Sequence, residues 1–247
     1  MLSRGLICLR ITSRIFDEPA VIGGKIKGHV TMEHAKSLPD FLADRYRTWK
    51  DNQYADSAGH LRKLARDGQN PSTLLIACSD SRVHSFAMFG VEPGEFFLHR
   101  NIANLVPAYE LDGGVHGTSA VIEYAVTALH VPHIVVLGHS GCGGVRGCHD
   151  MCRGDAPDLE AKTSFVGRWM DALRPGYDRV KHIEDEATRV SALEREGVVQ
   201  SLSNLMTFPF VAARVAAGQV SLHGLWTDIG EGTLEQYDPS QGVFIPV

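Results

Sequence analysis

The stretch Thr73-Leu74-Leu75-Ile76-Ala77-Cys78-Ser79-Asp80-Ser81-Arg82 joins a short apolar run to a run of polar side chains. Asn70-Pro71 precedes it, and a proline there ends any helical pattern, so residues 73–78 predict a short buried strand. Apolar runs of the same kind, bounded by turn residues or charge, recur at 95–99, 133–138 and 219–224. We therefore expect four buried strands that belong to one sheet.

Between the second and third of these strands, apolar side chains repeat at helical spacing over residues 120–129. A strand, a helix and a further strand form a crossover unit, in which the two strands are parallel. Continuous apolar strands that alternate with helices predict an α/β fold, a single domain with a mostly parallel central sheet flanked by helices. Ligands of such sheets bind at the carboxyl ends of the strands.

The spacing of apolar side chains predicts further helices. Residues 39–67 predict an amphipathic N-terminal helical arm, interrupted near residues 56–59. After the third strand, residues 146–157 are polar and predict irregular structure. Three more helices are expected, at 164–173, at 184–206 with a break near Gly197, and at 209–217. No Gly/Ser/Pro linker divides the chain, so residues 32–247 predict one domain.

Composition and charge argue against several classes of protein. The 247 residues carry 24 Lys and Arg against 29 Asp and Glu, a formal net charge of −5, so no basic footprint for nucleic acid is present. No window approaches the roughly 20 apolar residues that a membrane-spanning helix needs. Five cysteines form an odd set in a chain too long to need disulfide staples, which predicts reduced thiols and a cytoplasmic location.

The first 31 residues predict an N-terminal extension. Residues 1–28 contain five Arg or Lys but only two acidic residues, and an Arg-rich, acid-poor start resembles an organelle-targeting segment. Met32, however, is followed directly by a predicted helical segment and fits an initiator. We therefore favour a flexible tail or an over-extended start for residues 1–31 over a targeting role.

Two of the predicted strands end in residues that bind metals. Cys78 closes the first strand, and His139 follows the third, with Cys142 three residues later. Two thiolates and an imidazole are donors that zinc prefers, and neighbouring parallel strands would bring them to one edge of the sheet. Three protein ligands leave the fourth position open, which is typical of catalytic rather than structural zinc.

The residues that follow Cys78 are suited to orient a nucleophile on the metal. Asp80 could accept a hydrogen bond from a zinc-bound hydroxide, and Arg82 could hold that carboxylate in a bidentate pair. Without this restraint, Asp80 could itself bind the zinc as a fourth ligand and close the site. The sequence therefore predicts a Cys-His-Cys zinc site with an Asp-Arg dyad beside it.

The two motifs together, Cys78-Ser-Asp-Ser-Arg82 and His139-Ser-Gly-Cys142-Gly-Gly144, resemble the signature of the β-class carbonic anhydrases. The resemblance covers about residues 69–237 and extends to blocks at 92–95, 99–104, 122–126 and 202–210, the last two close to the plant-like branch. It implies reversible hydration of CO2 to bicarbonate and a proton, by attack of zinc-bound hydroxide. It also implies one Zn²⁺ per subunit, bound by Cys78, His139 and Cys142, with the Asp80-Arg82 dyad orienting the nucleophile.

The resemblance further implies a substrate pocket and a partner. By position, the pocket residues of the family fall on Gln69, Phe97, Ile102 and Tyr124. In the family the N-terminal helices embrace a second subunit, and the pocket lies at that interface. This implies a homodimer or a multiple of dimers, in which residues 39–67 form the dimerisation arm.

One regulatory feature of the family is incomplete in this sequence. Members with a bicarbonate-triggered inactive state carry a Trp three residues before the first zinc Cys, an Arg in the His-Arg-Asn block and a later Tyr. Here Leu75 stands in place of the Trp, Arg100 is kept, and the tyrosine region reads Leu225-Trp-Thr-Asp228. We therefore expect the open, active form at neutral pH.

The residues also permit other interpretations. Cys148, His149 and Cys152 could complete a closed structural zinc site with Cys142, which would make a non-enzymatic zinc-binding or redox module. The run Gly138-His-Ser-Gly resembles the nucleophile elbow of serine hydrolases, but Cys142 replaces its last glycine. Enzymes of the related fold hydrolyse carbon disulfide or carbonyl sulfide, and the sequence does not separate these substrates from CO2.

Overall fold

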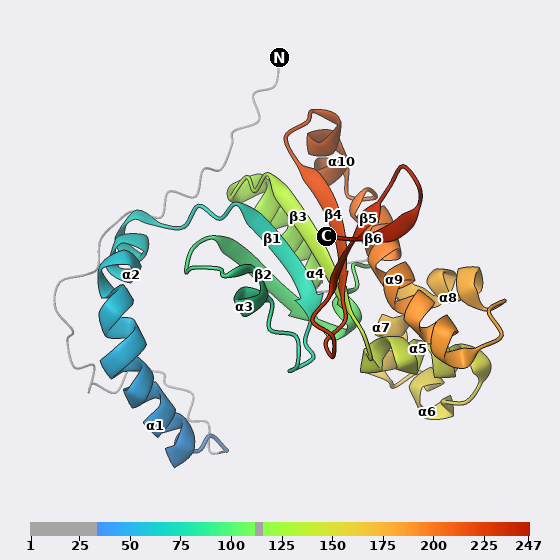
Figure 1. Ribbon diagram of the computed structural model, residues 1–247, viewed down its shortest axis with the longest axis horizontal. Coiled ribbons are helices and arrows are strands. Elements are labelled where there is room, and N and C mark those ends of the chain that lie inside the picture. The colour runs from blue at the N-terminus through green and yellow to red at the C-terminus, as the bar shows by residue number, and fades with distance from the viewer. Residues whose placement is uncertain (1–33, 112–115) are drawn as a thin grey trace. The chain divides into compact units, whose positions relative to one another are not determined.

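The computed structural model describes residues 34–111 and 116–247 (Figure 1). The chain divides into two compact units, Met1–Gly68 and Gln69–Val247. The predicted extension, residues 1–31, lies outside the described residues, as does its boundary at residue 32. The boundaries of the predicted domain therefore stay predictions.

The described part of the first unit is a helical arm. It consists of α1 (Asp40–Trp49), a π-helical turn η1 (Lys50–Tyr54) and α2 (Ala55–Asp67). The predicted arm is confirmed, but its interruption at 56–59 is wrong. The irregular turn precedes α2, which continues through Gly59 because a glycine inside a helix costs only about 1 kcal/mol. Large apolar side chains of the arm are exposed, namely Leu38, Phe41, Leu42, Tyr46 and Trp49.

Among the described residues of the second unit, six strands form one sheet, in the order β2-β1-β3-β4-β5-β6 (Figure 1). The first four are parallel and match the four predicted strands: β1 (Thr73–Cys78), β2 (Phe96–Asn101), β3 (His133–His139) and β4 (Ser221–Thr227). The antiparallel strands β5 (Leu234–Asp238) and β6 (Val243–Pro246) escape the sequence pattern because they are short and none of their residues is fully buried. The predicted α/β fold with a mostly parallel sheet is confirmed.

One face of the sheet carries the main hydrophobic core. Ile76 of β1 and Val136 of β3 point to this face and are fully buried. It is covered by α4 (Gly117–Glu123), the π-helical turn η3 (Tyr124–Ala128), α9 (Glu186–Leu205) and α10 (Pro209–Ala216). Burying a large aliphatic side chain contributes about 1.5–3 kcal/mol, and a slip of one residue would turn it to the other face, so this core fixes the register of the strands.

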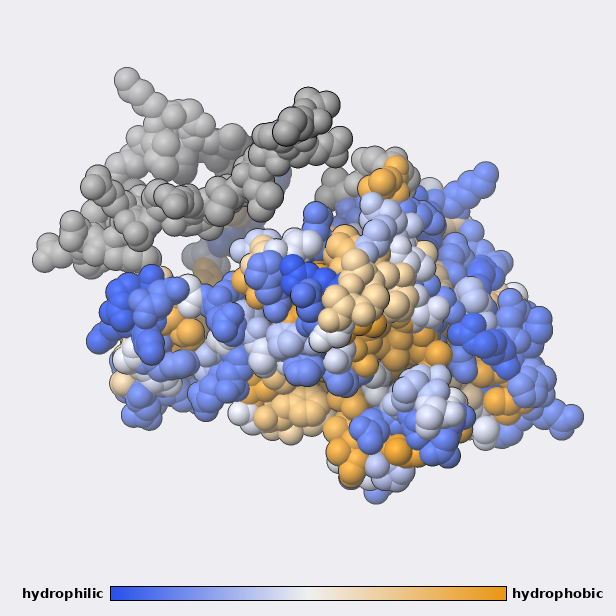
Figure 2. Space-filling model, turned by 90° about the horizontal axis from the view of Figure 1, so that it is seen from above, coloured by the Kyte–Doolittle hydropathy of each residue, from blue (hydrophilic) through white to orange (hydrophobic). Residues whose placement is uncertain are grey.

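The opposite face is covered more sparsely. A smaller cluster around Leu137 is buried there, and the short helix α3 (Ser85–Phe89) packs beside it through contacts of Phe86 and Phe89 with Phe96. Large side chains of α3 and of the edge strand β2 remain exposed, namely Phe86, Met88, Phe89 and Leu98. Figure 2 shows apolar areas, in orange, among the hydrophilic surface of the face seen there. Exposed apolar groups next to an edge strand are typical of an interaction surface.

Two further predictions of secondary structure are wrong in detail. Residues 146–157, expected to be irregular, lie mainly in α5 (Gly143–Arg153), which begins after Cys142 and ends before Gly154. Helix α9 runs unbroken through Gly197, because packing against Leu173 outweighs the helix cost of glycine. Between α5 and α9 lie α6 (Pro157–Glu160), α7 (Phe165–Met170), the 3-10 turn η4 (Asp171–Leu173) and α8 (Arg174–Val180).

In the described parts of the chain, no helix has the length and apolar character needed to cross a membrane.

Candidate metal centre

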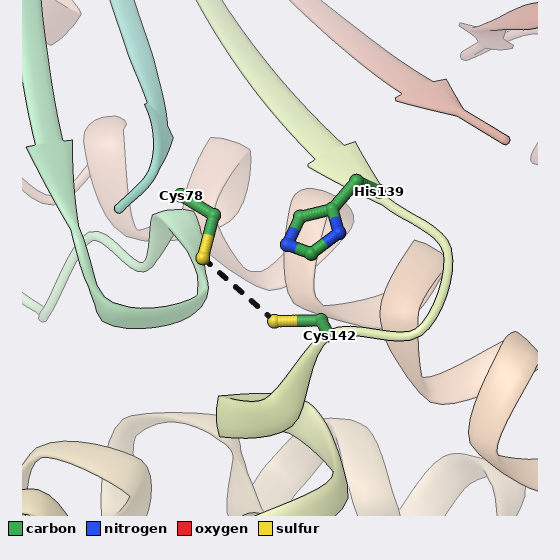
Figure 3. Close-up of side chains that lie close together, drawn as sticks. All are labelled: Cys78, His139 and Cys142. Atoms are coloured by element: carbon green, nitrogen blue, oxygen red, sulfur yellow. Dashed lines mark hydrogen bonds between the residues drawn. The ribbon is translucent and has the colours of Figure 1, made fainter. Parts of the chain in front are cut away.

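The carboxyl ends of β1 and β3 bring together three side chains of types that bind metals (Figure 3). Cys78 is the last residue of β1 and His139 the last of β3, and the two strands are parallel neighbours. Cys142 follows a turn at Gly141, whose φ of 64° favours glycine, and stands directly before α5. The expected convergence of Cys78, His139 and Cys142 is observed, and we refer to these three residues as the metal group.

The side chains of the metal group are buried and close enough to share one ion. The relative exposure is 4% for Cys78, 0% for His139 and 2% for Cys142. Their ligand atoms all lie within 4.8 Å of one another, and the two sulfur atoms are 3.9 Å apart. Zinc bonds of about 2.0–2.3 Å at tetrahedral angles separate ligand atoms by about 3.3–3.8 Å. The group therefore needs little movement to close on zinc.

The imidazole of His139 is oriented by a backbone carbonyl. Its Nδ1 lies 2.9 Å from the carbonyl oxygen of Ser140, so Nδ1 carries the proton and donates it. Nε2 then holds a lone pair, and this buried atom has no hydrogen-bond partner among the described residues. Leaving a buried polar atom without a partner costs free energy, and a metal ion at Nε2 would remove that cost.

Backbone N–H groups surround the sulfur atom of Cys78. Ala103 and Asp80 donate their N–H groups to it at 3.3 Å and 3.5 Å. Contact with the Cys142 thiol lowers the pKa of Cys78, and these N–H groups act in the same direction against the effect of burial. The same contact, together with burial, raises the pKa of Cys142. The pair therefore favours a thiolate on Cys78, and the thiolate is the form that binds metals.

The turn that supplies one of these N–H groups is strained. Ala103, in the 3-10 turn η2 (Ile102–Asn104) after β2, has a left-handed backbone with a φ of 61°, which is uncommon for residues other than glycine. Gly144 lets this turn approach α5, because a Cβ at position 144 would lie only 2.7 Å from Cγ2 of Ile102. Packing thus holds a strained turn against the loop that carries Cys142.

Asp80 and Arg82 form a bidentate pair, as expected. Arg82 donates from Nε to Oδ1 at 3.0 Å and from Nη2 to Oδ2 at 2.7 Å. Nη2 also donates to the carbonyl oxygen of Gly141, which ties the pair to the turn before Cys142. Arg82 holds the pKa of Asp80 well below its usual range, so the carboxylate is ionised at neutral pH. Both carboxylate oxygens are engaged in this arrangement, and Asp80 stands outside the metal group.

A buried carboxylate that sequence patterns do not single out supports the Cys142 loop. Glu194 of α9 accepts the backbone N–H of Cys142 on Oε1 at 3.2 Å and the indole N–H of Trp226 on Oε2 at 3.3 Å. Burial raises the pKa of Glu194, and these donors oppose the rise. Glu194 stands in the run Leu193-Glu-Arg-Glu196, where charged side chains normally mark a solvated face. Nothing in that pattern indicates its contact with the Cys142 loop.

Arg100 braces the loop that carries Asp80. Its Nε donates to the carbonyl oxygen of Cys78 at 2.8 Å, and its Nη2 donates to those of Asp80 at 2.6 Å and Val83 at 3.1 Å. A single guanidinium thus holds three carbonyl groups between the end of β1 and the start of α3. Arg100 is the one residue of the family's bicarbonate clamp that this sequence keeps, and its guanidinium binds backbone carbonyl groups here.

The four residues assigned to the substrate pocket do not lie together within one chain. Ile102 belongs to the strained turn beside the metal group and is 41% exposed. Phe97 and Tyr124 contact each other, with ring centroids 5.8 Å apart, but Phe97 pairs with β1 about 13 Å before Cys78 along the strand. Gln69 is exposed at the start of the second unit. The role of all four residues in substrate binding stays a prediction.

A cavity of about 500 Å³ lies beside Ile102. Its walls combine apolar side chains with hydroxyl, amide and imidazole groups, and its lining includes Ser79, His99, Asn101, Ile102, Thr118 and Trp169. Ser79 directly follows Cys78 in the chain. The cavity therefore adjoins the end of β1, where the first residue of the metal group lies.

Cys148, His149 and Cys152, which we call the α5 cluster, do not form a metal site. Nδ1 of His149 contacts Asp150 at 2.8 Å, and its Nε2 accepts from Arg189 at 3.1 Å, so both ring nitrogens are engaged. Within residues 34–111 and 116–247, the metal group is the only set of three or more such side chains that could hold one ion. The alternative of a closed structural zinc site on α5 is therefore wrong.

Ser140 is not arranged as a nucleophile. Its Oγ accepts the backbone N–H of Ile229 at 2.9 Å. The adjacent imidazole of His139 points into the space beside the two sulfur atoms (Figure 3). This geometry does not support the interpretation of the motif as a serine-hydrolase elbow.

Three side chains of metal-binding types at the edge of a parallel sheet, with an ionised Asp-Arg pair beside them, are the arrangement typical of α/β metalloenzymes with an open centre. The family described as carbonic anhydrase matches residues 73–234 of this chain. The chain belongs to the carbonic anhydrase family.

Its relatives identify the β class within that family. The chain is 36% identical over 197 residues to beta carbonic anhydrase 3 of Arabidopsis thaliana, and the match spans 77% of this chain and 73% of the relative. It is 39% identical over 207 residues to a carbonic anhydrase of Pseudomonas aeruginosa, and that match spans 83% of this chain and 90% of the relative. The solved structure of the β-carbonic anhydrase CcaA matches with a TM-score of 0.75 at 30% identity, over 84% of this chain and 91% of that one. A tetrameric β-carbonic anhydrase of Sordaria macrospora matches with 0.65 at 31% identity, over 80% and 95%.

Proposed function

We propose that this protein catalyses the reversible hydration of CO2 to bicarbonate and a proton, with a single Zn²⁺ per chain held by the metal group. One observation carries the proposal. Two buried sulfur atoms and an imidazole nitrogen that lacks a partner among the described residues converge within 4.8 Å, next to the ionised pair of Asp80 and Arg82. When bound, Zn²⁺ supplies the Lewis acidity that activates water as a nucleophile near neutral pH.

In this proposal Asp80 orients the nucleophile. Its side chain is 17% exposed, so a small molecule in the site can reach it, and an ionised carboxylate only accepts hydrogen bonds. A water molecule held at Asp80 directs its proton to the carboxylate and its lone pair away from it, toward the substrate. Arg82 keeps the carboxylate ionised and, through the carbonyl of Gly141, fixes its position relative to Cys142.

The cavity beside Ile102 supports a small substrate of low polarity. CO2 carries no hydrogen-bond donor, and apolar walls with a few polar groups are typical of sites for small molecules. We assign Ile102 to the wall on the side of the metal group. Phe97 and Tyr124, which lie farther along the sheet and are at least partly exposed, together with Gln69, would line a pocket that a second copy of the chain completes.

We propose that the second copy is part of a homodimer or a multiple of dimers. The exposed apolar side chains of α3 and β2, such as Phe89 and Leu98, border an edge strand that monomeric proteins usually protect. The arm exposes a further apolar set around Trp49, in line with the predicted dimerisation role of residues 39–67. The relative from Sordaria macrospora is described as tetrameric. The cytoplasmic location stays a prediction from the cysteine pattern.

Stopped-flow measurement of CO2 hydration, on protein of known zinc content, tests the proposed activity. We expect zinc-dependent turnover that rises with pH across about pH 6–9, the range in which water on catalytic zinc titrates. Protein that carries its full zinc content and shows no turnover of CO2 would overturn the proposal. Hydrolysis of carbon disulfide and carbonyl sulfide, measured on the same samples, tests the two alternative substrates.

A further inference from the structure

A pair of histidines lies at the amino ends of β3 and β4, away from the metal group. His133 is the first residue of β3 and His139 is the last, so about 20 Å separates the two ends of this strand. His223 is the third residue of the neighbouring strand β4. Neither His133 nor His223 belongs to the metal group or lines the cavity beside Ile102.

The two imidazoles of this pair face each other. Nδ1 of His133 and Nε2 of His223 are 3.3 Å apart, and the ring centroids are 5.3 Å apart at an interplanar angle of 58°. At this distance the N–H group of one ring donates a hydrogen bond to the nitrogen of the other. Two nitrogen ligands on a tetrahedral ion, with bonds of about 2.0–2.1 Å, are also about 3.3–3.4 Å apart. The two nitrogen atoms are therefore already at the spacing that an ion bound between them, in place of the hydrogen atom, would require.

The backbone that carries the pair is held in the sheet. β3 and β4 are paired in parallel along their whole length, with Val135 opposite His223. Because side chains alternate along a strand, His133 shares a face with Val135, which packs against the buried cluster around Leu137. The histidine pair thus stands at the exposed rim of a packed cluster. A site held on rigid strands loses little conformational freedom when it binds a ligand.

The exposure of the pair and the charge state of His223 also suit a metal ion. Both residues are exposed to solvent, so an ion can reach them. Partial burial, and then the neighbouring His133, lower the pKa of His223. Protons therefore compete weakly for its ring at neutral pH, and neutral imidazole is the form that binds metals.

We propose that His133 and His223 form a second metal site, for a borderline divalent cation such as Zn²⁺, Ni²⁺ or Cu²⁺, with water in the remaining positions. Imidazole is a preferred ligand of this class of ion, whereas Mg²⁺ and Ca²⁺ prefer oxygen ligands. Two neutral ligands bind more weakly than a site with two thiolates, so the pair fills after the metal group. The proposal does not depend on the proposed activity.

Calorimetric titration with Ni²⁺, on protein whose metal group is already filled with zinc, tests the site. We expect the wild type to bind one further ion per chain. His133→Ala and His223→Ala each remove one of two ligands and should weaken binding by roughly 100-fold, because the second contact is no longer made within one molecule. His182→Ala removes a different exposed histidine and should leave the affinity unchanged.

A spectroscopic measurement separates the pair from other histidines. Electron paramagnetic resonance of added Cu²⁺ should show coupling to two imidazole nitrogens in the wild type and to one in either variant. Mg²⁺ should not bind under the same conditions. Equal Ni²⁺ affinity in the wild type, His133→Ala and His223→Ala would overturn the proposal, and so would an equal loss in His182→Ala. The zinc content of each variant shows that the fold and the metal group are intact.

Discussion

The metal group and the α5 cluster contain the same side chains, two cysteines and one histidine each, but their surroundings differ. In the metal group, Nε2 of His139 has no hydrogen-bond partner in the described parts of the chain and lies near two sulfur atoms. In the α5 cluster, His149 is engaged on both sides, by Asp150 and by Arg189. Residue type alone therefore does not make a metal centre. The ligand atoms must converge, and the imidazole nitrogen among them must lack another partner.

Removing one cysteine from each cluster tests this difference most strongly. Cys142→Ala leaves two ligands, and we expect the purified protein to lose its zinc and its CO2 hydration to fall to the uncatalysed background. Cys152→Ala removes a half-buried thiol of the α5 cluster and should keep both. Zinc is measured by mass spectrometry and turnover by stopped flow. Zinc retained in the first variant, or lost in the second, would remove the distinction between the clusters.

Asp80→Asn separates metal binding from the orientation of the nucleophile. The substitution keeps the size of the side chain but removes the charge that Arg82 holds in place. We expect a full zinc content and a fall in CO2 hydration of roughly 100-fold or more. Asp178→Asn, which breaks an exposed pair with Lys181, is the matched control and should not change the rate. A rate for Asp80→Asn close to that of the wild type would contradict the proposed role.

Glu194 tests whether the support of the Cys142 loop matters for zinc. Glu194→Ala leaves the N–H of Cys142 and the indole of Trp226 without their acceptors, and we expect zinc affinity to fall roughly 10- to 100-fold. Glu194→Gln keeps one acceptor oxygen and should recover part of the loss. Competition with a chromophoric chelator measures the affinities. Glu196→Ala, on the same helix but paired with Arg179 on the outside, is the control. Equal affinities in all variants would limit Glu194 to a role in packing.

The fold is predictable from the sequence where local pattern and tertiary packing agree. The apolar run of β1 is bounded by Pro71 and by polar residues, and every residue of the strand is buried. Prediction fails where packing outweighs the local pattern. Gly197 stays inside α9 because Leu173 packs beside it. The mostly polar segment after Cys142 forms α5 because one face of that helix is buried against neighbouring helices. Such contacts come from elements far apart in the sequence.

The metal group is predictable for a related reason. Cys78 and His139 each end a strand, and parallel strands place their carboxyl ends at one edge, so the topology itself implies their convergence. The residues that support the group are different, because Glu194 and Arg100 act on backbone groups that carry no sequence signal. The predicted pocket role of Phe97 has no such support, because within one chain Phe97 contacts Tyr124 away from the metal group.

The carboxylates beside the two clusters are alike in one respect. Arg82 holds the pKa of Asp80 below its usual range. Burial raises the pKa of Asp150, but His149 and Arg146 together lower it by more than burial raises it, so the net shift is also downward. For both residues the pKa in the folded state lies below the unfolded value of about 3.9. The ionised form therefore stabilises the fold above that pH, and the contribution is lost as the pH falls through the folded-state pKa.

The smallest expected effect is the pH dependence of this contribution at Asp80. The side chain of Arg82 is 54% exposed, so water and salt screen the pair and its effect on the free energy of unfolding is small. Denaturant unfolding of metal-free wild type and Asp80→Asn should show a modest advantage for the wild type at neutral pH. The advantage should shrink as the pH is lowered through about 4 to 3, because the unfolded chain takes up its proton first. An advantage that grows toward low pH would show that Asp80 binds its proton more tightly in the folded state, and that Arg82 does not keep it ionised.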